Sequence, residues 1–404
     1  MSWRRCRLDW LTSEERGAVN PTEISADTVF HYSIPALDEI GDGRLEQPDE
    51  IGSGKLLLSG GEVLISKLNP RLPRVLLAEA HDVPTLASTE FIALRPGPNV
   101  DERFLRYWLG SEPLRQMLNG ATMSVTRSQQ RVRPEIVTKS WLRVPSIDDQ
   151  RAIADYLDRE TARIDALIEK KRRMVELLEE RKWALVVESL DRVPSRSVPL
   201  RRLLTSLADG PFGSSVMTSH YSDAGIRVVR LANIGPAEFD NSDEAYLPSQ
   251  RMLELNRHRV SAGDLLIAGL GDDGHPVGRA CVAPDLGPAI VKADCYCGRV
   301  DTSRAVPEYL AWYLSSPTGN DEVARTGRGS TRSRINLDIA RSISVLLPDL
   351  TAQVSLSRFW SEKSGAGQKA TSALRAQIEL LVEHRHALVT AAVSGQLDIP
   401  GVAA

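Results

Sequence analysis

Two long segments with helical periodicity dominate the pattern of apolar and polar positions along this chain. The first runs from Ala152 to about Val187 without a glycine or a proline. Its heptad positions are Leu157, Ile164, Lys171, Leu178 and Leu185, with Leu167 and Met174 at the flanking position. An apolar stripe at this spacing favours packing against a partner helix. The pattern therefore predicts a long helix that is paired along its length.

The second periodic segment lies at the C-terminal end and repeats the same phase. Leu374, Leu381 and Leu388 fall at heptad spacing, with Ile378 beside them. The preceding stretch "SGAGQ" (364–368) holds two glycines, each of which costs ~1 kcal/mol inside a helix. We therefore expect this helix to begin near Lys369. The matched phases predict that helices 152–187 and 369–393 pack antiparallel.

The segments before each helix have a different pattern, with short apolar runs between turn residues. The runs are "KLLLSGGEVLIS" (55–66), "GIRVVRLANIG" (225–235), "GDLLIAGLG" (263–271) and "ISVLL" (343–347). Runs of this length, bounded by turns, are typical of strands. Segments 101–118 and 307–317 each predict one amphipathic helix. The expected fold class is α+β, a mixed α/β arrangement, with a boundary near the linker 191–199.

The two halves of the chain repeat each other. "LLEERKWALV" (177–186) and "LLVEHRHALV" (380–389) share six of ten positions at an offset of 203 residues. At the same offset, Pro145 and Gln150 align with Pro348 and Gln353. A period near 200 is too long for a solenoid repeat. The pattern indicates a tandem duplication of one variable domain followed by one helix.

Composition and charge limit the class of protein. Hydrophobic residues make up 42% and charged residues 25% of the chain, as in ordinary globular proteins. A net charge of −3 disfavours indiscriminate coating of nucleic acid, although a local basic patch remains compatible with it. Four cysteines, with no secretory signal and no membrane-length apolar run, indicate the reducing cytoplasm.

Signatures of catalysis or of a bound cofactor are not found. Gly54 and Lys55 resemble the end of a P-loop, but Leu56 stands where Ser or Thr is needed. No glycine fingerprint of a dinucleotide site opens a helix, and we find no Asn/Asp-Pro-Pro-aromatic motif of amino-methylating enzymes. The spacing of Cys295 and Cys297 favours buried structural cysteines over a zinc site. For "GDDGHP" (271–276) a turn is favoured over a metal site.

Two basic segments carry the strongest functional signal. Residues 124–133 and 325–334 are rich in Arg, Ser and Thr, contain no acidic residue and occupy the same address in the repeat. Arginine forms paired bonds with guanine and glutamine with adenine, while hydroxyls bind phosphate oxygens. Lys67 and Arg71 are weaker candidates, and Arg227, Arg230 and Asn233 are weaker still. The DNA-binding candidates are Lys67, Arg71, Arg127, Gln129, Gln130, Arg131, Arg133, Arg328, Thr331, Arg332 and Arg334.

The chain resembles a known family in the regions that end each repeat. Segments 144–186 and 347–353, together with 374–401, are similar to the two conserved regions of type I restriction-modification specificity subunits. The "GDLLIAGL", "GIRVVRLANI" and Pro-x4-Gln elements also resemble that family. The first region departs from the pattern because it lacks the Gly-x-Leu/Ile-Asp ending found at Gly395–Asp398. The second departs from it at "SGAG".

The resemblance implies a non-catalytic subunit that binds double-stranded DNA. It implies target-recognition domains at 1–146 and 195–350, conserved helices at 147–190 and 351–399, and a pseudo-twofold arrangement that reads a split, asymmetric site. Its expected partners are two methyltransferase subunits and the restriction subunits. S-adenosylmethionine, ATP and Mg are expected in those partners and not in this chain. The alternatives are a single-chain DNA-modifying enzyme and a duplicated protein-binding scaffold.

Overall fold

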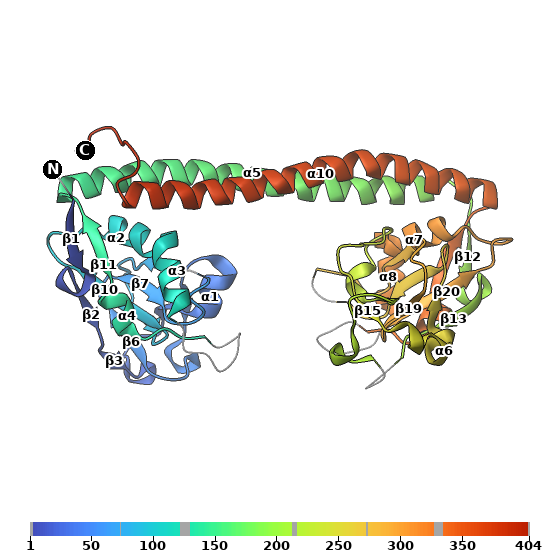
Figure 1. Ribbon diagram of the computed structural model, residues 1–404, viewed down its shortest axis with the longest axis horizontal. Helices are drawn as coiled ribbons and strands as arrows, with labels where there is room; N and C mark the ends of the chain where they lie inside the picture. The colour runs from blue at the N-terminus through green and yellow to red at the C-terminus, as the bar shows by residue number, and fades with distance from the viewer. Residues whose placement is uncertain are drawn as a thin grey trace. The chain divides into compact units, whose positions relative to one another are not determined.

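The computed structural model describes residues 3–72, 74–121, 130–211, 216–271, 274–326 and 334–402. The chain divides into two compact units, and each contains one globule and parts of two long helices (Figure 1). Unit 1 combines Met1–Arg172 with Arg375–Ala404, and unit 2 is Arg173–Leu374. Each unit therefore contains the first part of one long helix and the last part of the other.

The globule of unit 1 is built from short strands and short helices that precede the first long helix. In chain order the elements are β1 (Arg4–Arg7), β2 (Thr12–Glu15), β3 (Ala18–Val19), β4 (Val29–Tyr32), α1 (Ile34–Ile40), β5 (Arg44–Glu46), β6 (Lys55–Leu58), β7 (Val63–Ser66), β8 (Val75–Leu77), β9 (Thr85–Ser88), β10 (Phe91–Pro96), α2 (Glu102–Leu109), α3 (Glu112–Gly120), α4 (Pro134–Thr138), β11 (Trp141–Val144) and α5 (Ile147–Asp191).

The globule of unit 2 follows a related order. Its elements are β12 (Arg196–Pro199), β13 (Leu204–Ala208), β14 (Ile226–Val229), β15 (Tyr246–Leu247), α6 (Met252–Leu255), β16 (Arg259–Val260), β17 (Leu265–Ala268), β18 (Ala280–Val282), β19 (Ala289–Val291), β20 (Cys295–Val300), α7 (Pro307–Ser315), α8 (Pro317–Thr326), α9 (Leu337–Ser342), β21 (Ser344–Leu347) and α10 (Leu350–Val393). The predicted mixture of strands and helices is confirmed.

One four-stranded sheet in each globule corresponds to the other strand by strand. Unit 1 has a sheet of order β2-β10-β7-β8, and unit 2 has one of order β13-β20-β17-β18. In both, the neighbours are antiparallel: β10 pairs with β7, and β20 pairs with β17. A ribbon of β1 with β11, or of β12 with β21, leads into each long helix. The equivalence supports the duplication inferred from the sequence.

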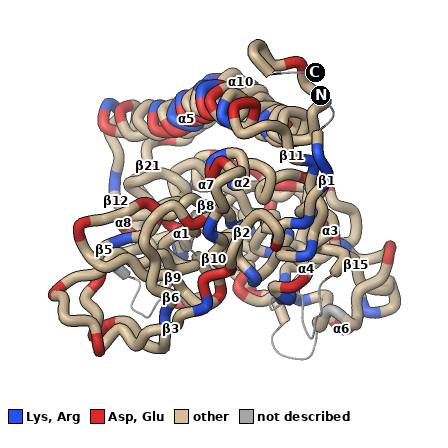
Figure 2. Tube along the Cα trace, turned by 90° about the vertical axis from the view of Figure 1, so that its left-hand side faces the viewer, with Lys and Arg blue, Asp and Glu red and all other residues tan. Residues whose placement is uncertain are grey.

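The long helices α5 and α10 pack antiparallel within each unit, as predicted. In unit 1, Lys171 Nζ donates to Gln377 Oε1 at 2.6 Å, and Arg385 Nε lies 2.9 Å from Asp165 Oδ1. The residue number thus falls along α10 as it rises along α5. In unit 2, Trp360 Nε1 donates to Ser189 Oγ at 2.7 Å. Both helices carry basic and acidic residues (Figure 2).

The predicted start of the second long helix near Lys369 is wrong. Helix α10 begins at Leu350 and continues through Gly365 and Gly367. Trp360 is 2% exposed and Ser364 6% exposed, so this part of the helix is packed against its surroundings. Tertiary packing therefore outweighs the cost of ~1 kcal/mol per glycine on which the prediction was based.

The prediction for the flanking position of the α5 stripe is also wrong. Leu167 is 41% exposed and Met174 is 52% exposed. The buried positions are instead Thr161 at 4% and Ile168 at 6%, which lie four residues after Leu157 and Ile164. Sequence periodicity alone cannot rank the two stripes, because both follow the heptad positions, and burial in the folded unit selects the second; Thr161 packs against α2, where its Oγ1 lies 3.2 Å from Tyr107 Oη.

The segment 101–118 forms two helices, where one was predicted. Helix α2 ends at Leu109 with Gly110 as its C-cap, and α3 begins at Glu112 with Pro113 in its first turn. A proline is well accommodated at a helix start but interrupts a helix interior, because it lacks the N–H group. The break lets α2 pack on α5: Tyr107 Oη donates to Asp158 Oδ1 at 2.7 Å.

A buried glutamine fixes the beginning of each long helix to its globule. Gln150 Nε2 donates to the carbonyls of Asn99 and Pro145, both at 3.1 Å, and its Oε1 accepts from Asp101 N at 3.0 Å. Gln353 repeats this arrangement with the carbonyls of Arg304 and Pro348 and with Val306 N. Both side chains are 0% exposed. The Pro-x4-Gln element is therefore a structural clamp.

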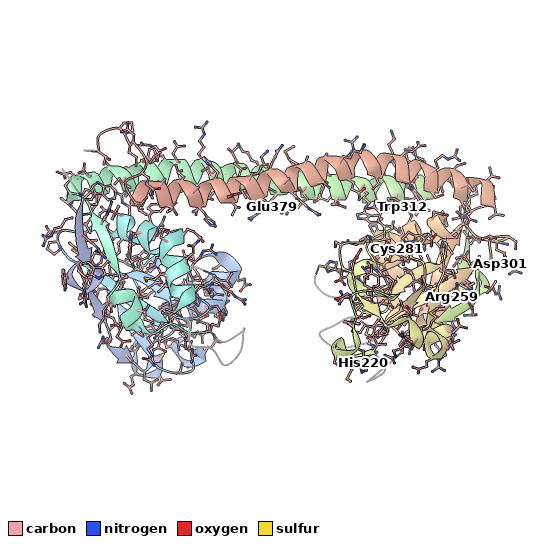
Figure 3. The ribbon with its side chains drawn as sticks, in the orientation of Figure 1. His220, Arg259, Cys281, Asp301, Trp312 and Glu379 are labelled. Carbon is pink, nitrogen blue, oxygen red and sulfur yellow. The ribbon has the colours of Figure 1, made fainter. Side chains whose placement is uncertain are left out.

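In unit 2 the helices are joined to the globule by aromatic packing. The ring centroids of Trp360 and Tyr309 are 5.7 Å apart, and those of Trp183 and Trp312 are also 5.7 Å apart. Figure 3 labels Trp312 on the side of the globule that carries the helices, and Cys281 inside the globule. Large aromatic contacts of this kind contribute strongly to burial.

Candidate nucleic-acid interface

Several of the predicted DNA-binding residues lie outside the residues that the structure describes. They are Arg127, Gln129, Arg328, Thr331 and Arg332. The described candidates are Lys67, Arg71, Gln130, Arg131 and Arg133 in unit 1, and Arg334 in unit 2. The geometry of the site therefore rests on the residues at which each basic segment rejoins its globule.

In unit 1 the chain rejoins the globule beside the end of β7. Asn69 N donates to Gln130 O at 2.8 Å, and Val132 N donates to Lys67 O at 3.0 Å. Leu68 and Arg131 form an isolated antiparallel bridge. Val132 is buried, so it fixes the segment to the core, while Arg131 and Arg133 on either side of it are exposed.

Unit 2 repeats this arrangement beside the end of β17. Ile335 N donates to Gly269 O at 3.0 Å, and Leu270 forms an isolated antiparallel bridge with Arg334. Ile335 is buried and Arg334 is exposed. Arg131 and Arg334 therefore occupy equivalent positions in the two units, at the address that the sequence repeat indicated.

Each of these two arginines forms an ion pair with an acidic residue that sequence reasoning missed. Arg131 Nη2 lies 2.7 Å from Glu90 Oε1, and Arg334 Nη2 lies 2.7 Å from Asp294 Oδ1. Glu90 and Asp294 directly precede β10 and β20, which are equivalent strands. Extending the repeat alignment to these strands would have brought the two acids together.

The turn that carries Asp294 is held by a second carboxylate. Asp209 Oδ1 accepts from Asp294 N at 3.1 Å and from Gly210 N at 2.7 Å. Asp294 adopts the left-handed conformation, with φ 66°, which is uncommon for non-glycine residues but which Asp accepts more readily than most. Burial raises the pKa of Asp209 above its usual range.

The remaining described candidates surround the unit 1 site without an ion pair among the described residues. Lys67 is half-buried after β7, Arg71 is exposed before β8, and Arg133 is exposed at the start of α4. The position in unit 2 that corresponds to Lys67 is Gly269. A Cβ at Gly269 would lie 2.5 Å from the Tyr296 hydroxyl, so no side chain fits there.

The weakest candidates of unit 2 have structural roles. Arg227 is 3% exposed, and its Nη2 donates to Asn241 Oδ1 and to Asp243 O, both at 3.0 Å. Asn233 is 0% exposed and donates to backbone carbonyls. These two residues are therefore unavailable to DNA. The first part of their segment forms the strand β14, as expected for a run of alternating strand residues.

A further basic group of unit 2 lies near Asp294 and joins Arg230, a weak candidate in the sequence, with Lys292, which was not predicted. Lys292 Nζ donates to Tyr221 Oη at 3.3 Å, and the Arg230 guanidinium lies 5.8 Å from the Tyr221 ring centroid. Arg230 also pairs with Asp243. The sequence contained no signal that these residues lie together, because they come from separate segments.

The cysteines are buried and free, as expected for Cys295 and Cys297. Burial raises the pKa of the Cys281 thiol to about 12. In the described ranges, no group of three or more His, Cys, Asp or Glu residues could hold a metal ion. None of the helices described in the structure combines the length and apolar content that a bilayer crossing requires.

Comparison with known proteins gives no sequence match but a clear structural one. No protein-family model and no curated protein sequence matches the chain. One solved chain, from work on complex assembly and conformational transition of the type I R-M system, matches with a TM-score of 0.68 at 18% identity, over 98% of both chains. The chain shares the fold of that solved chain. The resemblance stated above is thus confirmed at the level of the fold.

Two specificity subunits from named organisms match over similar lengths with lower scores. The HsdS subunit from Thermoanaerobacter tengcongensis has a TM-score of 0.44 at 19% identity, and covers 98% of this chain and 97% of its own. The type I restriction-modification S subunit from M. genitalium has a TM-score of 0.39 at 12% identity, with the same coverage.

Proposed function

We propose that this chain is the DNA-specificity subunit of a type I restriction-modification complex. The observation that carries the proposal is the likeness in fold to a chain of that system over 98% of both lengths. The duplicated globules support it, because each places an exposed arginine, Arg131 or Arg334, at an equivalent position. Duplicated domains that present equivalent loops suit a DNA site made of two halves.

The two halves of the site would differ in sequence. The equivalent loops have diverged. The first basic segment contains Gln129 and Gln130, while the second contains no glutamine, and Gly269 stands at the position of Lys67. Different side chains at equivalent positions read different bases. The proposal is therefore a split, asymmetric target, with one half read by each unit.

The chain acts through partners and performs no chemistry itself in this proposal. Two methyltransferase subunits bind the helix pair, and restriction subunits join them; S-adenosylmethionine, ATP and Mg belong to these partners. Exposed apolar side chains on the helices support such docking: Leu167 and Leu380 in unit 1, and Met174 and Leu177 in unit 2. The proposal places the complex in the cytoplasm, with chromosomal DNA.

Sequencing of methylated bases in the host genome, with and without this gene, tests the proposal. The expected result is one split adenine-methylation motif that is lost with the gene. An unchanged methylome would contradict the proposal. Methyl transfer or DNA cleavage by the purified chain alone would instead favour the single-chain enzyme.

Substitution of the two equivalent arginines tests the assignment of the halves. We expect Arg131→Ala and Arg334→Ala each to weaken binding by ~1–3 kcal/mol, and each to relax recognition of one half-site only. Binding is measured on duplexes scrambled in either half. If both variants bind intact DNA as the parent does, with the same salt dependence, the loops are ordinary solvated surface and the assignment of these arginines is wrong.

A further inference from the structure

An acidic side chain holds the equivalent arginine in each unit. Arg131 Nη2 lies 2.7 Å from Glu90 Oε1. Arg334 contacts Asp294 Oδ1 through both Nη2 at 2.7 Å and Nε at 3.0 Å. The backbones beneath the pairs also correspond, since Lys67 N donates to Glu90 O and Gly269 N to Asp294 O, each at 2.8 Å. The same arginine–carboxylate pair is thus present in both units, with Glu as the acid in unit 1 and Asp in unit 2.

Folding stability does not account for these pairs. The side chains of Arg131 and Glu90 are 65% and 30% exposed, and those of Arg334 and Asp294 are 56% and 21% exposed. Ion pairs at such exposure contribute little to stability, because water and salt screen them. An acid placed among arginines at a DNA-binding surface also repels the phosphate backbone. The pairs therefore need an explanation in terms of what the arginines contact.

The acid changes the ligand that its arginine prefers. A guanidinium has five N–H donors, and each pair leaves Nη1 free of the carboxylate. A phosphate at the free edge would lie close to the carboxylate, and the two negative charges would repel each other. The N7 and O6 atoms of guanine are neutral acceptors that match the arginine fork, so they carry no such penalty.

We propose that Arg131 and Arg334 read base edges, and that Glu90 and Asp294 are positioning residues that keep these arginines off the phosphates. This inference rests on the proposed function and adds a division of labour to it. Lys67, Arg71 and Arg133 have no acidic partner among the described residues, so they are the phosphate contacts of unit 1. A base edge that offers two acceptors, such as that of guanine, is the ligand of the paired arginines.

The test removes the acid's charge while keeping its hydrogen-bond acceptor. Glu90→Gln and Asp294→Asn are compared with Glu39→Gln and Glu254→Gln. These controls each remove one exposed carboxylate that pairs with an arginine, in α1 of unit 1 or in α6 of unit 2, and neither lies on the long helices. The full chain, with its methyltransferase partner where needed, is titrated with two DNA duplexes over a range of salt concentrations. One duplex has a random sequence, and the other carries the motif that methylome sequencing identifies.

The expected result is a gain in binding to random DNA together with a loss of discrimination. Freed arginines contact phosphates, so each variant binds the random duplex several-fold more tightly and steepens the salt dependence by about one unit. Discrimination falls roughly tenfold in one half-site only: the first half for Glu90→Gln and the second for Asp294→Asn. Glu90→Asp, which restores the charge, returns discrimination toward that of the parent. The two controls do not change half-site discrimination.

Two results would overturn the inference. One is unchanged discrimination and an unchanged salt slope in both variants. The other is an equal loss of binding to target and random duplexes with lower thermal stability, which would mark the acids as structural. A parent complex that does not distinguish its methylated site from random DNA overturns the proposed function, and this inference with it.

Discussion

The glutamine that fixes the start of α5 gives a stability prediction that can be worked out from its contacts. Replacement of Gln150 by Leu keeps a similar volume but removes both the donor and the acceptor. Of the three hydrogen bonds, those to Asp101 N and Pro145 O are buried, while Asn99 is exposed and water can replace its bond. Two buried backbone groups are thus left without a partner.

The expected loss follows from those two groups. Each unpaired buried group costs about 1–3 kcal/mol, so Gln150→Leu should destabilise unit 1 by roughly 2–6 kcal/mol. In unit 2, the bond of Gln353 to Pro348 O is buried, but those to Val306 N and Arg304 O are only partly buried. Gln353→Leu should therefore cost less.

Hydrogen exchange of the α2 and α7 amides, read by mass spectrometry, measures the two units separately. Gln150→Leu should speed exchange in α2 and leave α7 unchanged, and Gln353→Leu should do the reverse. Gln116→Leu is the control, because the Gln116 side chain is exposed and bonds only Glu112 on its own helix. Exchange in α2 that matches the parent in Gln150→Leu would refute the reasoning.

Two further predictions concern α10 and the pH dependence of unit 1. Gly365→Ala and Gly367→Ala should each raise the free energy of unfolding by about 0.5–1 kcal/mol, because an added Cβ meets nothing within 4 Å. Gly319→Ala, in α8, is the contrasting variant: it should lower the thermal midpoint, because its Cβ would lie 2.2 Å from a backbone oxygen. Equal midpoints would contradict both. Burial lowers the pKa of His31 more than Glu46, 2.7 Å away, raises it. The unfolded chain therefore binds that proton more tightly, and unit 1 should lose stability as the pH falls below about 6.5. Urea midpoints near pH 8 and pH 5.5 should differ more for the parent than for His31→Gln; equal differences would contradict this.

The sequence by itself determined the duplication, the helix pair and the address of the basic loops. Heptad spacing is a local property, so Leu157, Ile164 and Leu178 predict a paired helix without any knowledge of the partner. The offset that aligns Gln150 with Gln353 also aligns Arg131 with Arg334, because duplicated segments keep their order along the chain. These features depend only on neighbouring residues or on the repeat, and the structure agrees with them.

Tertiary structure alone decided which face of α5 is buried, where α10 begins and what the arginines contact. Both Leu167 and Ile168 lie on plausible stripes, and only the folded unit shows that Ile168 is the buried one. Helix propensity placed the start of α10 after Gly367, but packing around Trp360 extends the helix back to Leu350. Glu90 is 41 residues from Arg131, and the turn before β10 brings the two side chains together. Interactions between residues that are far apart in the chain produce no periodic pattern in the sequence, so sequence periodicity cannot predict them.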